Sequence, residues 1–134
     1  MSSSIGSDAD RALQLKATVI LLTLVKTREF TIPLLISLVA TPLFLFAAAG
    51  AAGAGHGSYF LAKILFPFTM LSTVLFGSII APFIAIAFLQ FPIYGLVLGR
   101  ANVKGKIAGW GTRLMVIHVL AVLVCFLLVG ESFS

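Results

Sequence analysis

Five polar side chains inside long apolar runs are the residues of this sequence best placed to do chemistry. They are Ser37, Thr41, Gln90, Tyr94 and His118. Gln90 and Tyr94 lie four residues apart, so on a helix they share one face. If each run crosses a membrane, a rise of about 1.5 Å per residue puts all five in its cytoplasmic half, with His118 about 8 Å deep. The sequence therefore predicts one polar cluster there.

Two interpretations of this cluster are open. In the first, the side chains form hydrogen bonds between helices, which contribute about 0.6–2 kcal/mol. In the second, they line a small polar pocket, and His118 is a titratable switch or a ligand contact, because histidine changes its charge near neutral pH.

A second polar group follows the first long apolar run. In a helix, His56, Tyr59 and Lys63 would share one face. Such side chains anchor at the level of lipid headgroups, so we expect a contact with a lipid phosphate or a partner on the outer face. Ser58 lies beside His56, but a serine nucleophile also needs a group that orients the base and an oxyanion site. Neither is identifiable, so we predict no catalytic residue and no enzyme activity.

The carboxylates exclude several kinds of site. The four acidic residues lie outside the apolar runs: Asp8, Asp10, Glu29 and Glu131. An intramembrane proton relay or a carboxylate metal cluster would need a carboxylate inside an apolar run. His118 and Cys125 are separated by about 10.5 Å of helical rise, whereas zinc ligands lie about 2.0–2.3 Å from the metal. We therefore expect no metal and no cofactor.

The composition sets the class of protein. Of 134 residues, 60% are hydrophobic and 10% are charged, against roughly 45–50% and about 25% in a soluble domain. A soluble chain this short could not bury so much apolar surface. The net charge of +5 comes from short basic clusters beside apolar runs, without the interleaved aromatic residues of a nucleic-acid site. The sequence predicts an all-α integral membrane protein with no nucleic-acid partner.

The hydropathy pattern divides the chain into two parts. Residues 1–30 are expected to form a cytoplasmic tail with an amphipathic helix at the membrane interface, with Leu13, Ala17, Ile20 and Leu24 on its apolar face. Residues 31–134 are expected to form a three-span domain. Its spans are predicted at about 32–52, 68–99 and 113–130, with a short interfacial or re-entrant segment, 56–67, after the first span.

The second span needs a choice, because residues 64–99 contain no charge. As one helix they would measure about 54 Å, well beyond a hydrocarbon core of about 30 Å. The run can form one kinked span with an interfacial start, or two short spans. One span puts the basic residues before the first span on the same side of the membrane as those after the second span, as the positive-inside rule favours. The first set is Arg11, Lys16, Lys26 and Arg28, and the second is Arg100, Lys104, Lys106 and Arg113. We therefore predict one span with kinks near Pro82 and Pro92, a cytoplasmic N-terminus and an outer C-terminus, in a bacterial plasma membrane.

Small residues predict where helices pack. They repeat every four residues on the predicted second span, at Thr69, Thr73, Gly77, Ala81 and Ala85, and Gly95 and Gly99 form a GxxxG pair. Such stripes let two helices approach closely. The contact can lie within one chain or between chains.

Partners and function follow from these features. We expect anionic lipid at a basic cluster, Arg100, Lys104, Lys106 and Arg113, and association with a second copy or another membrane subunit. The favoured function is an accessory, structural or assembly subunit that acts by helix–helix packing. The alternative is a small oligomeric transporter or channel lined by the second span, and a membrane enzyme is a distant third.

Overall fold

The computed structural model describes residues 4–53, 59–77 and 81–128, and its secondary structure over these residues is helical. The helices are α1 (Ser4–Gly53), α2 (Phe60–Leu65), α3 (Pro67–Met70), α4 (Ser72–Phe76), α5 (Ala81–Val103) and α6 (Ile107–Leu128). In the described part of the chain, α1, α5 and α6 are long and apolar enough to cross a membrane. The predicted all-α membrane class, with three spanning helices, is confirmed.

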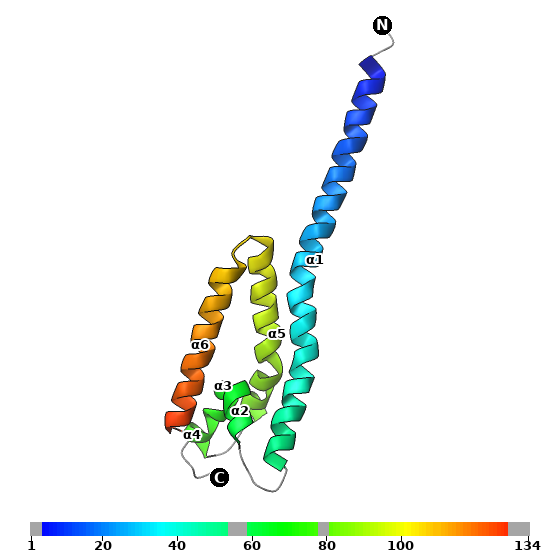
Figure 1. The fold of residues 1–134 in the computed structure, drawn as a ribbon. Helices are drawn as coiled ribbons and strands as arrows, with labels where there is room; N and C mark the ends of the chain where they lie inside the picture. Colours follow the sequence, from blue (N-terminus) through cyan, green and yellow to red (C-terminus); the bar gives the residue numbers. More distant parts are fainter. Residues whose placement is uncertain (1–3, 54–58, 78–80, 129–134) are drawn as a thin grey trace.

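The three long helices lie side by side, with α5 between α1 and α6 (Figure 1). α5 runs antiparallel to α1 and is joined to α6 by a tight turn, in which Gly105 has a φ of 65°. We call this the hairpin end of the bundle. The short helices α2, α3 and α4 fill the opposite end, where α1 and α6 finish.

The predicted break between an interfacial helix and the first span is absent, because α1 is one helix of 50 residues. Thr31, at the expected break, donates its hydroxyl to the carbonyl oxygen of Thr27 within the helix, at 2.7 Å. Pro33 removes the amide that would bind the carbonyl of Glu29. Asn102 of α5 supplies the missing donor, with 3.1 Å between its Nδ2 and the Glu29 oxygen. The helix therefore continues through the proline.

α1 and α5 approach most closely at two glycines. A Cβ atom on Gly95 would overlap the Ser37 hydroxyl and lie 2.8 Å from the carbonyl oxygen of Pro33. A Cβ atom on Gly99 would lie 2.5 Å from the carbonyl oxygen of Phe30. The structure thus places the GxxxG pair at a contact between two helices of the same chain.

Within the part that the structure describes, the charge-free run holds one spanning helix, but this helix is Ala81–Val103 and not the predicted 68–99. α4 ends at Phe76, where the left-handed φ of 66° at Gly77 stops the helix, and the spanning helix α5 runs from Ala81. Pro82 therefore lies in the first turn of α5, where proline is well tolerated, and does not kink a longer helix. The four-residue stripe is divided as well: Thr69 and Thr73 are buried in short helices, whereas Ala81 and Ala85 are exposed on α5.

Residues 59–77 form what we call the re-entrant segment, which enters the bundle and returns to the same end (Figure 1). Pro67 and Ser72 are fully buried, and Phe66 is only 3% exposed. Phe66 packs against Ala48 of α1 and Ala87 of α5. The segment predicted over 56–67 is thus longer than expected, and it lies inside the bundle because its apolar side chains fill the gap between the long helices.

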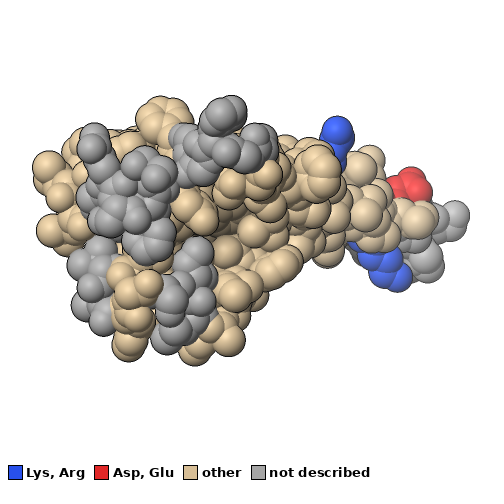
Figure 2. Space-filling model, turned by 90° about the horizontal axis from the view of Figure 1, so that it is seen from below, with Lys and Arg blue, Asp and Glu red and all other residues tan. Residues whose placement is uncertain are grey.

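Charged side chains are unevenly distributed along the bundle. α6 starts at Ile107, so only a turn separates it from α5. Arg113 lies within α6, with its guanidinium carbon 5.1 Å from the Trp110 ring centre. Figure 2 looks at the bundle from the end opposite the hairpin. In this view, the coloured charged side chains lie on the part of α1 that projects beyond the bundle.

Candidate functional site

Three of the five predicted cluster residues meet at the end of α2. Gln90 of α5 donates from Nε2 to the carbonyl oxygen of Leu65, at 2.9 Å. His118 of α6 donates from Nε2 to the carbonyl oxygen of Ile64, also at 2.9 Å. The Tyr94 hydroxyl lies 3.2 Å from Nδ1 of His118. We call Gln90, Tyr94 and His118 the carbonyl-binding cluster.

The carbonyls need these donors because α2 ends at Leu65. The last carbonyl groups of a helix have no amide partner within it. The amide of Thr69, which in a continuous helix would bind the carbonyl of Leu65, binds that of Phe66 instead, at 3.1 Å. An unsatisfied backbone group in a membrane costs several kcal/mol. Side chains from α5 and α6 therefore cap the end of α2 and tie the re-entrant segment to both helices.

His118 lies near the middle of its helix. It is 11 residues from Ile107 and 10 from Leu128, which places it about 16 Å and about 15 Å from the two ends. The predicted depth of about 8 Å is counted from Arg113, which lies inside α6, six residues after its start. An ionisable side chain within a spanning helix is costly to keep and commonly marks a functional position.

The hydrogen bonds define the tautomer of His118. A carbonyl oxygen only accepts, so Nε2 carries the hydrogen that binds Ile64. In the neutral ring Nδ1 is then an acceptor, and the Tyr94 hydroxyl is its donor. The two rings also meet edge to face, with their centres 6.0 Å apart. Both ring nitrogens are thus occupied within the protein, and the arrangement suits an anchor.

Replacing Tyr94 with phenylalanine is expected to change the environment of His118 Nδ1 while Nε2 stays protonated. The loss of one neutral hydrogen bond should lower the free energy of unfolding by about 1 kcal/mol. Nitrogen NMR of histidine-labelled protein checks this, and His56→Gln leaves His118 as the sole histidine signal. Protonation of both ring nitrogens of His118 at neutral pH would contradict the assignment.

One atom of the cluster is left without a partner in the described part of the chain. Gln90 is 4% exposed, and its Oε1 is buried and accepts no hydrogen bond from a described group. Gln90 is also one of the residues that line a hollow of about 210 Å³, together with apolar side chains that include Phe68 and Leu89. The amide therefore binds through its nitrogen alone.

Ser37 and Thr41 do not join the cluster. The Ser37 hydroxyl donates to the carbonyl of Leu34, and the Thr41 hydroxyl donates to the carbonyl of Ser37, both at 2.7 Å. Serine and threonine in helices often satisfy themselves in this way. Equal depth in the membrane was therefore insufficient to bring all five side chains together.

Of the second predicted polar group, His56, Tyr59 and Lys63, the structure describes Tyr59 and Lys63. His56 lies outside the described residues. Tyr59 immediately precedes α2, and Nζ of Lys63 lies 5.7 Å from the ring centre of Phe126 on α6. Over the described residues, no three histidine, cysteine, aspartate or glutamate side chains lie close enough together to hold a metal ion.

Sequence reasoning missed Asn102, and it marked Thr69 as a small packing residue without the hydrogen bond that it forms. Asn102 reaches the Glu29 carbonyl on α1, and the Thr69 hydroxyl donates to the carbonyl of Phe83 at 2.9 Å. For Asn102 a signal existed, because Pro33 follows Glu29 by four residues and so frees its carbonyl. The chain matches no protein-family model, no curated protein and no solved structure.

Proposed function

We propose that this protein is an accessory subunit of a membrane assembly and that it acts by packing its helices against a different subunit. The observation that carries the proposal is the first half of α1, residues 10–28, which we call the arm. The arm extends past the hairpin end of the bundle (Figure 1), and all its side chains are exposed. Eight large apolar side chains on it are more than half exposed: Leu13, Leu15, Val19, Ile20, Leu21, Leu22, Leu24 and Val25.

The arm is apolar on two opposite faces. At 3.6 residues per turn, Leu13, Ile20 and Leu24 fall on one face, and Leu15 and Leu22 fall on the other. A helix at a membrane surface buries one apolar face and leaves the other polar. Two apolar faces favour contact with neighbouring helices on both sides.

The threonine hydroxyls of the arm are satisfied within it. The hydroxyls of Thr18, Thr23 and Thr27 each donate to the carbonyl four residues earlier, all at 2.8 Å. These hydroxyls therefore need no water as a partner, and Gln14 and the charged side chains of the arm are left as its polar groups. α1 would measure about 75 Å, so a span over 32–52 leaves the arm outside the hydrocarbon core.

The distribution of charge supports a cytoplasmic arm in a plasma membrane. The hairpin end carries Arg100, Lys104 and Lys106, and the end of the arm adds Lys26 and Arg28. Basic residues favour the cytoplasmic side. The alternative of an oligomeric pore receives less support, because the carbonyl-binding cluster faces the re-entrant segment of its own chain.

Replacing Leu13 and Ile20 with serine is expected to release the partner while leaving the chain in the membrane. Native mass spectrometry of gently extracted protein measures this. The wild type should carry one other polypeptide in fixed ratio, and the variant should lose at least nine-tenths of it. Gln14→Ala with Thr18→Ala, on the polar side of the same turns, is the matched control and should keep the partner. Isolated single chains, or closed rings of identical chains, would overturn the proposal, and the rings would favour the pore.

A further inference from the structure

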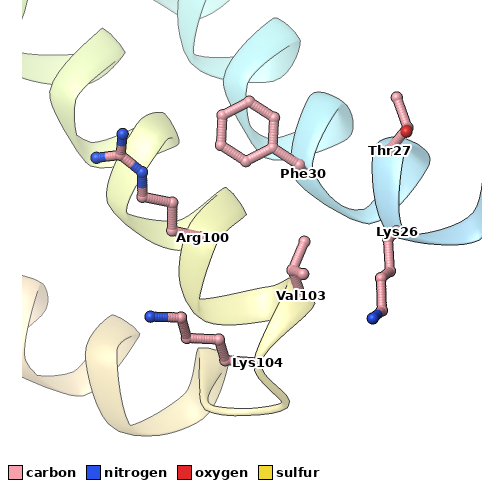
Figure 3. Close-up of a pocket in the computed structure, with 6 residues that line it drawn as sticks. All are labelled: Lys26, Thr27, Phe30, Arg100, Val103 and Lys104. Carbon is pink, nitrogen blue, oxygen red and sulfur yellow. The ribbon is translucent and has the colours of Figure 1, made fainter. Parts of the chain in front are cut away.

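A pocket of about 470 Å³ lies at the hairpin end, where α1 passes the last turn of α5. We call it the basic pocket, and it is lined by Lys26, Thr27, Phe30, Arg100, Val103 and Lys104 (Figure 3). It adjoins the place where Gly99 meets the Phe30 carbonyl and Asn102 binds Glu29. The contacts that hold the two helices together therefore also bring these basic residues, distant in sequence, to one site.

The pocket has an excess of positive charge. Lys26, Arg100 and Lys104 are exposed, and no carboxylate lines the pocket. The C-terminal end of α5 opposes an anion with roughly half a negative charge. Part of this effect is removed because loop amides bind the carbonyls of Ala101 and Asn102. Arg100 and Lys104 lie on one side of the pocket and Lys26 lies on the other (Figure 3), and their three positive charges exceed what remains of that half charge.

The pocket also has an apolar part. Phe30 and Val103 lie between the basic side chains, one from each helix (Figure 3). A free phosphate ion would gain nothing from this surface. A phospholipid would place its phosphate at the basic groups and its glycerol and first methylene groups against Phe30 and Val103.

The pocket lies at the level expected of lipid headgroups. No charged residue occurs on α1 after Glu29, and none on α5 precedes Arg100. Both charge-free runs therefore begin or end at the pocket. On α6, Trp110 stacks with Arg113 near the same end, and tryptophan is enriched at membrane interfaces.

We propose that the basic pocket binds the phosphate group of an anionic phospholipid. The site differs from the basic cluster expected from sequence. Arg100 and Lys104 belong to it, Lys26 joins them from α1, and neither Lys106 nor Arg113 lines the pocket. Lys26 and Thr27 belong to the last turn of the arm. The apolar side chains on which the proposed function rests, such as Leu13 and Ile20, do not line the pocket, so the two proposals are tested separately.

Titration of the full chain in detergent with phosphatidylglycerol, followed by native mass spectrometry, tests the proposal. The variant is Lys26→Gln with Arg100→Gln and Lys104→Gln. The control, Lys16→Gln with Lys106→Gln and Arg113→Gln, removes the same charge away from the pocket. We expect the pocket variant to lose affinity for phosphatidylglycerol by about tenfold or more. We expect the control to lose less than about threefold. Lys26→Gln against Lys16→Gln repeats the comparison with one change on the same helix.

Three results would overturn the proposal. Equal losses in the pocket variant and the control would mean that only total charge matters. Equal affinity for phosphatidylcholine, which has no net charge, would remove the selectivity for anionic lipid. Binding of glycerol phosphate as tight as that of phosphatidylglycerol would assign the site to a soluble anion.

Discussion

Replacing Gly95 with leucine is expected to separate α1 from α5 and to lower the free energy of unfolding by about 3 kcal/mol. The reason is steric. Even a Cβ atom at this position would lie 2.7 Å from Cβ of Ser37 and 2.8 Å from the Pro33 carbonyl oxygen. One of these neighbours is backbone, so no change of rotamer can relieve the overlap.

Reversible unfolding in mixed micelles measures the effect. Gly109→Leu is the matched control, because a Cβ atom at Gly109 meets no atom within 4 Å. Gly95→Ala should fall between the control and Gly95→Leu, and adding Ser37→Gly should recover part of the loss. If Gly95→Leu were as stable as Gly109→Leu, the close α1–α5 contact would be refuted.

Replacing both Gln90 and His118 with leucine is expected to release the re-entrant segment. The two substitutions leave the carbonyls of Ile64 and Leu65 without donors, at a cost of about 1–3 kcal/mol each. Cys125 reports the change, because it is 0% exposed and packs against Met70 of that segment. The sequence contains one cysteine, so a membrane-permeant maleimide labels this site alone. Labelling should be at least tenfold faster in the double variant.

Two comparisons make this experiment specific. His118→Gln keeps a donor near the position of Nε2 and should label more slowly than His118→Leu. Thr112→Ala removes a hydroxyl that binds only within α6, at Ala108, and should label like the wild type. A double variant that labels no faster than the wild type would show that these hydrogen bonds do not hold the segment.

The sequence by itself determined the class of the protein and the identity of most polar groups that meet. In lipid, the backbone N–H and C=O groups of a long apolar run find their hydrogen-bond partners within the run only if it is helical. The all-α membrane class therefore follows from composition and length. The spacing of Gln90 and Tyr94 placed them on one face, and both lie in the carbonyl-binding cluster with His118. Gly95 and Gly99 were marked as a close contact by residue size alone.

Only the tertiary structure decided how the charge-free run over residues 64–99 is divided. Hydropathy measures whether a segment avoids water, and it does not distinguish cover by lipid from cover by protein. The re-entrant segment is apolar because it is covered by α1, α5 and α6, with Pro67 and Ser72 fully buried. Its broken backbone is tolerated because side chains from α5 and α6 bind the freed carbonyls. Those partners lie 25 and 54 residues away in sequence, and only folding brings them together.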